Sequence, residues 1–136
     1  MKRDDPEGID ERSFRFFCEV IGFIETIPRG PKTDKLIEQL ADAAGSITGN
    51  RDEALGGSSR REFVRYNEIA LRSANESVKW LRACAARRFG DQPLCRRLLD
   101  EGRQIAKIIA KIIITTKRNG LDPPKPAPGP GPMPKT

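Results

Sequence analysis

Histidine is absent from this chain of 136 residues, and cysteine, tyrosine and tryptophan occur only three times, once and once. Without histidine the chain cannot build a Ser-His-Asp or Cys-His nucleophile, a histidine general base or a zinc site that contains histidine. Carboxylates such as Glu53, Glu62 and Glu76 lack the Glu-x-x-His partner that usually completes a di-metal site in a helical bundle. We expect no enzyme, no catalytic residue, no metal site and no cofactor.

Long apolar runs are missing as well, since none approaches the roughly 20 residues that a membrane span needs. Met1-Lys2-Arg3 leads into acidic residues rather than into the apolar stretch of a signal peptide. We expect a cytoplasmic protein with no membrane contact. The odd number of cysteines, without C-x-x-C spacing and in helical patterns, predicts buried free thiols at Cys18, Cys84 and Cys95.

Proline is absent between Pro31 and Pro93, which a chain of many short strands would rarely allow. Apolar residues recur every three or four positions in the segments between the Pro/Gly-rich turns. The sequence predicts an all-α, antiparallel, up-and-down four-helix bundle in one domain over 10–119, with helices near 10–27, 32–55, 58–89 and 92–119.

The two ends of the chain are expected to lie outside this domain, as a flexible N-terminus over 1–9 and a disordered tail over 120–136. Seven of the eleven prolines fall within 123–134, a composition that cannot form helix hydrogen bonds. The tail is either a solubilising extension or, through Pro123 to Pro126, a P-x-x-P ligand.

Helix starts carry their own signals. Ser59-Arg-Arg-Glu62 is a capping box, Asp91 is an N-cap with Pro93 in the first turn, and Thr33 or Lys32 begins the second helix. The glycine pair before Ser59 lacks the Gly-Lys-Ser/Thr ending of a P-loop and is expected to be a plain turn. The predicted inward face of the third helix consists of Phe63, Tyr66, Ala70, Ala74, Leu81 and Ala85.

The first predicted helix is apolar over more than half of its circumference, whereas one core contact needs a stripe of only about 100°. Either this helix is the most buried of the four, or its surplus apolar face meets another subunit. The second interpretation predicts a homo-oligomer with an interface at Phe16, Val20, Phe23 and Ile27.

Charge is divided unevenly along the chain. Residues 1–57 carry eight basic and twelve acidic side chains, whereas residues 58–119 carry fifteen and six. The asymmetry suggests a polyanionic partner, or pairing of one half with the other inside the fold or across an oligomer interface.

Two helix faces concentrate the basic residues, and we predict nucleic-acid binding at both. The third helix presents Arg61, Arg65, Arg72 and Lys79. Glu68 and Glu76 lie four residues on either side of Arg72, so a solvated ladder of ion pairs is the alternative there. The fourth helix presents Arg96, Arg103, Lys107, Lys111 and Arg118. Only Asp100 lies among these five, so either a phosphate or an acidic neighbour must offset their repulsion.

Apart from phenylalanine, the chain has only two aromatic side chains that could stack on bases, Tyr66 and Trp80. Tyr66 is expected in the core, and Trp80 on its flank, as a packing residue or an interface anchor. Any nucleic-acid contact should therefore be mainly to phosphate, strongly salt-dependent and weakly sequence-selective.

One stretch of the chain resembles a known family. The motifs are Ser46-Ile47-x-x-Asn50-x-x-Glu53, Ser59-x-x-Glu62-Phe63-x-Arg65, Ile69-Ala70 and Ser73-x-Asn75-Glu76. They look like those of the bacterial four-helix bundle proteins named for reading frames inside 23S rRNA intervening sequences, over about residues 12–118. The resemblance implies a four-helix protomer, a homopentamer and no established catalytic activity. It also implies a more distant kinship with the accessory protein of diversity-generating retroelements, which engages a reverse transcriptase and nucleic acid.

The chain departs from that family near the end of the second helix. Members have Asn-Ile-Ala-Glu-Gly where this chain has Asn50-Arg51-Asp52-Glu53-Ala54, and Arg72 replaces the glycine usual before Ser73. Arg51 falls close to the predicted core face, where an unpaired charge would be costly. Either the helix frays or rotates there, or Arg51 meets a carboxylate such as Asp52, Glu53 or one on a neighbouring subunit.

Two functions follow from these observations. The first is a non-enzymatic, homo-oligomeric bundle that binds RNA or DNA through its basic faces, as an accessory factor to a reverse transcriptase in one form of this hypothesis. The alternative is a structural or protein-interaction scaffold, whose basic half pairs with acidic surfaces of neighbouring subunits or of a protein partner.

Overall fold

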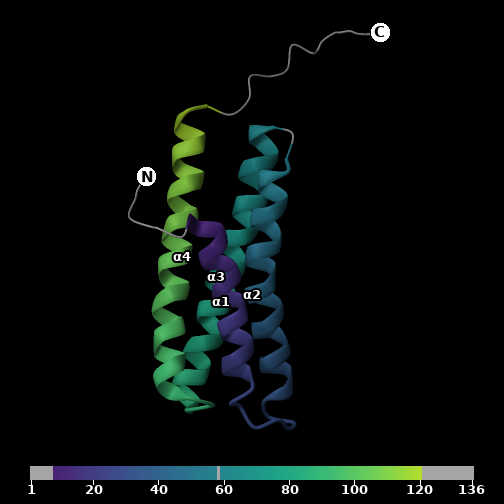
Figure 1. The fold of residues 1–136 in the computed structure, drawn as a ribbon, viewed down its shortest axis with the longest axis vertical. Coiled ribbons are helices and arrows are strands. Elements are labelled where there is room, and N and C mark those ends of the chain that lie inside the picture. The colour runs from purple at the N-terminus through teal and green to yellow at the C-terminus, as the bar shows by residue number, and fades with distance from the viewer. Residues whose placement is uncertain (1–7, 58, 121–136) are drawn as a thin grey trace, which may run out of the picture.

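The computed structural model describes residues 8–57 and 59–120, and all of the regular structure in this part of the chain is α-helical. The four helices are α1 (Gly8–Ile24), α2 (Asp34–Leu55), α3 (Arg60–Arg87) and α4 (Gln92–Arg118). Each helix packs against the next, and α4 packs against α1, which closes an up-and-down bundle (Figure 1). The predicted fold class is confirmed.

Helix ends follow local chemistry. The Ser59 hydroxyl accepts a hydrogen bond from the Glu62 N–H at 3.1 Å, and the Asp91 carboxylate accepts one from the Leu94 N–H at 3.1 Å, so both predicted N-caps are confirmed. α1 ends earlier than the predicted Ile27, because the N–H groups of Thr26 and Ile27 bond three residues back. α2 begins only at Asp34. The residue before it, Thr33, donates its hydroxyl to the backbone carbonyl of Pro28 and does not cap the helix with its side chain.

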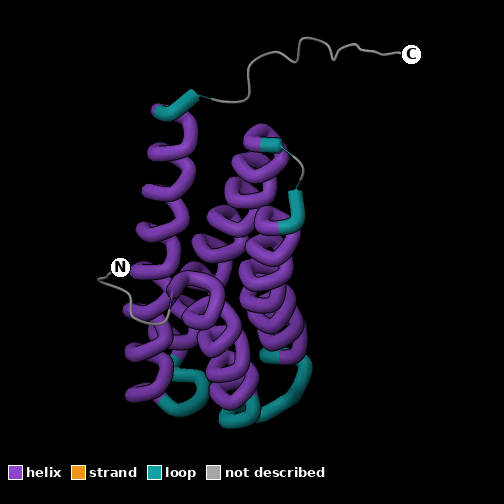
Figure 2. The backbone as a smooth tube through the Cα atoms, turned by 45° about the horizontal axis from the view of Figure 1, so that its top comes forward, coloured by secondary structure: helices purple, strands orange, loops and turns teal. Residues whose placement is uncertain are grey.

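α1 is the shortest helix and covers only part of the bundle's length. Its first turns lie beside the middle of α4, where Arg12 contacts Glu101. α4 and the α2–α3 hairpin continue beyond that level, as Figures 1 and 2 show. The chain enters α1 from residues 1–7 and leaves α4 into the tail, and both of these segments lie outside the described residues, together with the predictions made for them.

Helix three presents a different inward face from the one predicted. Phe63, Tyr66 and Ala85 are only half-buried, whereas Asn67 and Ser77 are fully buried. Both polar side chains bond within the helix, the Asn67 amide to the Phe63 carbonyl at 2.8 Å and the Ser77 hydroxyl to the Ser73 carbonyl at 2.9 Å. Hydrophobicity alone misplaced the face, because these bonds remove the cost of burying the polar groups.

Two of the three cysteines are buried, as predicted, and all three are free thiols. Burial, and secondly the neighbouring Cys95, raise the pKa of the Cys84 thiol to about 12. Cys18 is exposed on the outer side of α1, so the prediction was wrong for that residue.

Candidate nucleic-acid interface

The basic residues predicted on α4 are all exposed, at Arg96, Arg103, Lys107, Lys111 and Arg118. Within residues 8–57 and 59–120, no carboxylate lies within ion-pair distance of any of them. The neighbouring Lys117 and Arg97 differ, because they pair with Glu68 at 3.0 Å and Glu19 at 4.0 Å. Of the two explanations for the α4 face, an acidic neighbour in the same protomer is therefore not found among the described residues.

The basic residues predicted on α3 are exposed too, at Arg61, Arg65, Arg72 and Lys79. Among the described residues Arg72 forms no ion pair with Glu68 or Glu76, and Glu68 instead reaches across to Lys117 of α4. Arg65 lies over the Tyr66 ring at 4.5 Å and Lys79 over the Trp80 ring at 4.6 Å, cation–π contacts that leave both charges at the surface. Tyr66 and Trp80 are half-buried.

Between α3 and α4 the surface forms an open groove of about 400 Å³. Its lining consists of Asn75, Val78, Asp100, Arg103, Gln104, Ala106 and Lys107. Two of the nine predicted basic residues, Arg103 and Lys107, thus share one concave site. The other seven lie on the surrounding surface of the two helices and outside the groove lining.

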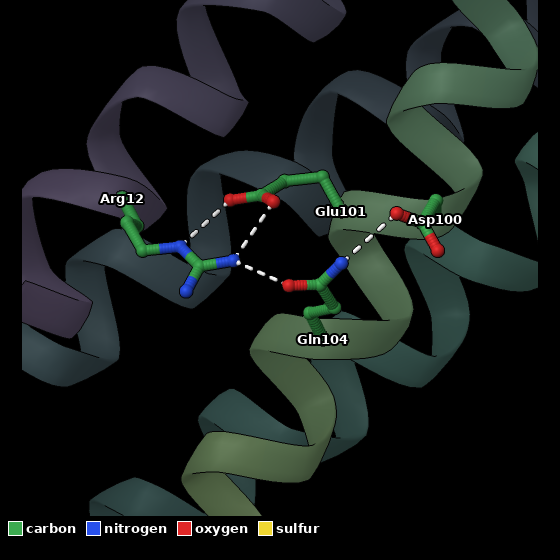
Figure 3. Close-up of polar contacts among 4 residues, drawn as sticks. All are labelled: Arg12, Asp100, Glu101 and Gln104. Carbon is green, nitrogen blue, oxygen red and sulfur yellow. Dashed lines mark hydrogen bonds and ion pairs between the residues drawn. The ribbon is translucent and has the colours of Figure 1, made fainter. Parts of the chain in front are cut away.

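A polar network from α1 reaches the edge of this groove (Figure 3). Arg12 donates two hydrogen bonds to the Glu101 carboxylate, at 2.8 and 2.9 Å, and a third to the Gln104 carbonyl at 3.1 Å. Gln104 in turn donates its amide N–H to Asp100 at 2.9 Å. Sequence reasoning missed Arg12 because its partners lie 89 and 92 positions away on α4. The i,i+4 spacing of Asp100 and Gln104 on α4 is a signal that could have indicated the second contact.

The motif residues of α2 and α3 meet in a second network. The Asn50 amide donates to the Ser46 hydroxyl at 3.0 Å, and the Ser73 hydroxyl donates to the same oxygen at 2.8 Å. The first bond lies within α2 and the second joins α2 to α3, through small polar side chains that are half-buried or buried. Part of the sequence motif is thus explained by packing between α2 and α3.

Arg51 lies within α2, which neither frays nor rotates out of the bundle, and only 4% of the residue is exposed. Its guanidinium donates two hydrogen bonds to Asp10 of α1, at 2.8 and 3.1 Å, and one to Asn67 of α3 at 2.8 Å. The carboxylate partner is therefore Asp10, and neither Asp52 nor Glu53. The pairing could not be read from the sequence, because it depends on where α1 begins against α2.

The four residues predicted as an oligomer interface are buried inside the protomer, with at most 3% of each exposed: Phe16, Val20, Phe23 and Ile27. A second copy could contact them only by opening the bundle, so the wide apolar surface of α1 mostly serves its own core. The apolar residues that α1 leaves exposed are Phe14, at 52%, and Ile21, at 38%.

Two further features, a metal-binding cluster of three such side chains and a membrane-spanning helix, are absent from the described part of the chain. Among residues 8–57 and 59–120, no group of three cysteine, aspartate or glutamate side chains is placed to hold a metal ion. None of the helices described there combines the length and apolar character required to cross a membrane.

Comparison with known proteins identifies a family and solved structures of similar fold. A model of the family described as 23S rRNA-intervening sequence protein matches residues 9–111. A solved structure of a protein of unknown function from Bacteroides thetaiotaomicron VPI-5482, assigned to the S23 ribosomal protein family, matches with a TM-score of 0.72 at 23% identity. The match covers 78% of this chain and 98% of the relative, and at this identity it shows the fold alone. No curated protein matches the chain.

Proposed function

Because the chain belongs to the family of 23S rRNA-intervening sequence proteins, we propose that it is a non-enzymatic, homo-oligomeric, cytoplasmic helical bundle that binds nucleic acid through the basic faces of α3 and α4. One observation supports this most strongly: the α4 face carries five exposed cations without an ion pair among the described residues. Phosphates of a nucleic acid would offset their mutual repulsion and release bound counterions.

Binding should be dominated by phosphate contacts. Long flexible basic side chains on convex helix surfaces neutralise phosphates without reading base edges, so affinity should vary little between sequences. In a homo-oligomer the same face repeats, and several weak contacts add up to useful avidity. We extend the proposal to an accessory role beside a reverse transcriptase, by analogy with the retroelement accessory protein, to which the family resemblance implies a more distant kinship.

The test is a charge reversal on α4. Changing Lys107 and Lys111 together to glutamate should weaken binding of single-stranded RNA and duplex DNA by more than about tenfold, because two phosphate contacts become repulsive. Helicity should be unchanged, since both side chains are exposed. Fluorescence anisotropy at two salt concentrations measures the affinity, which should fall steeply with salt for the unmodified protein.

A matched control reverses two exposed charges, one in the turn before α2 and one in its first turn, Lys32→Glu with Lys35→Glu. This control changes net charge equally but leaves the α4 face intact, so it should lose much less affinity. Equal losses in the two variants would indicate only a net-charge effect. Absence of binding by the intact oligomer at low salt would reject the proposal and favour the scaffold function.

The oligomeric part of the proposal uses the exposed side of α1. Phe14 and Ile21 lie seven residues apart, so they share one helix face, with Cys18 between them. Apolar side chains aligned on a surface in this way are typical of protein contacts. We propose that a second copy covers this stripe in a closed ring, with a pentamer as the expected number.

Replacing Phe14 and Ile21 together with glutamate should convert the oligomer into a folded protomer of 15.2 kDa, because the stripe loses its apolar surface without any change in the core. Light scattering after size exclusion measures the mass. Leu55→Glu is the control, since Leu55 is 60% exposed at the far end of α2. A mass of one protomer for the unmodified protein would refute the oligomer.

A further inference from the structure

The groove between α3 and α4 combines features that the proposed function does not by itself explain. Its volume of about 400 Å³ lies in the range of about 300–1,000 Å³ that is usual for small-molecule sites. Asn75, which belongs to the sequence motif, forms part of the α3 wall. Simple attraction to a phosphate backbone would require no concave site of this kind.

Two cations lie on one wall of the groove. Arg103 and Lys107 are four residues apart on α4, so their Cβ atoms are about 5–6 Å from each other. Both are exposed, and neither has an ion pair with any described residue. A single phosphate between them could receive charge-assisted hydrogen bonds from both, including a bidentate pair from the guanidinium.

The acid at ion-pair spacing from Arg103 on α4 is held by a different side chain. Asp100 lies three residues before Arg103, at a spacing where ion pairs form on a helix. Asp100 instead accepts a hydrogen bond from the Gln104 amide at 2.9 Å. Figure 3 shows Gln104 between Asp100 and Arg12.

Arg12 determines the direction of that amide. The Arg12 guanidinium donates a hydrogen bond to the side-chain carbonyl of Gln104 at 3.1 Å. It is itself fixed by two hydrogen bonds to the Glu101 carboxylate. Because the carbonyl points to Arg12, the amide nitrogen is the end that faces Asp100. A neutral side chain thus holds the carboxylate, and the charge of Arg103 remains available for a ligand.

The rest of the lining suits a nucleoside. Val78 and Ala106 provide apolar surface, and the Asn75 side chain makes no hydrogen bond with the other described residues. Asparagine can donate to and accept from the edge of a base. A base can enter such a groove only when it is unstacked, as in single strands and loops.

We propose that this groove binds one nucleotide unit of a single-stranded nucleic acid. The phosphate lies between Arg103 and Lys107, and the base lies on the apolar wall beside Asn75. The bonds from Arg12 through Gln104 to Asp100 are positioning contacts that keep the phosphate site unneutralised. This inference rests on the proposed function and specifies where and in which form the nucleic acid binds.

The first experiment compares single-residue variants of α4 in binding a single-stranded RNA oligonucleotide. Lys107→Ala or Arg103→Ala should weaken binding about tenfold, because each removes a charge-assisted hydrogen bond. Arg96→Ala is the matched control, an exposed cation on the same helix outside the groove, and should cost only about two- to threefold. Equal losses of RNA affinity in Arg96→Ala and Lys107→Ala would refute the binding site in the groove and leave the proposed function unaffected.

The second experiment tests the positioning contacts. Gln104→Leu keeps the size of the side chain but releases Asp100, which can then pair with Arg103. RNA affinity should fall about threefold, the equivalent of one exposed ion pair. Adding Asp100→Asn should restore the affinity, and the same change in the unmodified protein should raise the affinity less, because only a released carboxylate pairs with Arg103. An unchanged affinity in Gln104→Leu, or no restoration, would refute the positioning role.

Adenosine monophosphate separates this inference from the proposed function. At saturating concentration it should raise the melting temperature by about 3 °C, and Lys107→Ala should remove the shift. A Lys107-dependent shift without RNA binding would support the groove and reject the nucleic-acid function. No shift, together with no RNA binding, would reject both.

Discussion

Replacing Asp10 with alanine is expected to lower the free energy of unfolding by about 3 kcal/mol, because it leaves the buried Arg51 guanidinium without its charge partner. Only 4% of Arg51 is exposed, and after the change only Asn67 would remain among its polar partners in the described residues. Removal of one member of a buried pair costs about 3–5 kcal/mol, and the partial exposure of Asp10 favours the lower value. Urea denaturation followed by circular dichroism measures the loss.

The opposite change should be much milder. Arg51→Ile removes the buried charge itself, and the remaining Asp10 carboxylate, whose side chain is 41% exposed, can be hydrated. Isoleucine also occupies this position in the family motif that the sequence resembles. We expect a loss of about 1–2 kcal/mol, because the buried Asn67 side-chain oxygen loses the hydrogen bond from Arg51 while no charge is left buried.

Glu11→Ala is the control for the first prediction. Glu11 is an exposed acid in the same first turn of α1, so its removal has a similar effect on the helix dipole but leaves Arg51 paired. Its loss should stay below about 1 kcal/mol. If Asp10→Ala costs no more than Glu11→Ala, the buried pair does not contribute to stability as argued.

Replacing Gly90 with alanine is expected to have a comparable effect, about 3 kcal/mol, for two additive reasons. Gly90 has φ of 75°, a left-handed conformation that costs about 1–2 kcal/mol for an L-residue with a side chain. An added Cβ would also lie 2.8–2.9 Å from side-chain atoms of Thr26, Ile27 and Phe23. Overpacking of this kind costs about 1–3 kcal/mol.

The packing around Gly90 joins the segment that follows α1 to the start of α4. The Thr26 hydroxyl accepts a hydrogen bond from the Asp91 N–H at 2.9 Å, so displacement of Thr26 would also disturb the start of α4. Thermal denaturation of Gly90→Ala should show a melting temperature lower by at least about 10 °C.

Gly120→Ala separates the two causes. Gly120 also has positive φ, 88°, but apart from its chain neighbours no atom in the described part of the chain lies within 4 Å of the position of its Cβ. The Gly120→Ala variant should therefore lose only the stability that the left-handed backbone conformation costs, about 1 kcal/mol in the free energy of unfolding. Equal effects at Gly90 and Gly120 would show that the contacts with Thr26, Ile27 and Phe23 are not responsible.

The scaffold function and nucleic-acid binding predict different results for the same variant of α4. If α4 paired with acidic surfaces of a neighbouring subunit, Lys107→Glu with Lys111→Glu would break the oligomer. If α4 binds phosphates, the same variant keeps its mass and loses only nucleic acid. Light scattering and anisotropy on one preparation therefore distinguish the two functions.

Much of the fold follows from interactions between residues that are close in the sequence. The four helices, the N-caps at Ser59 and Asp91, and the exposure of the α4 cations were all predicted correctly. Helix periodicity and capping depend on spacings of three and four residues, which are visible in the chain itself.

Features that depend on how the helices are placed against one another required the tertiary structure. The sequence indicated that Arg51 needs a carboxylate, but Asp10 became its partner only through the alignment of α1 with α2. The same alignment buries Phe16 and Phe23, leaves Phe14 exposed, and brings Arg12 to Gln104 beside the groove. Such contacts join residues 41 to 92 positions apart, and their geometry depends on helix lengths, turn shapes and side-chain packing together. Local patterns determine which face of a helix is apolar, whereas only packing decides what each face meets.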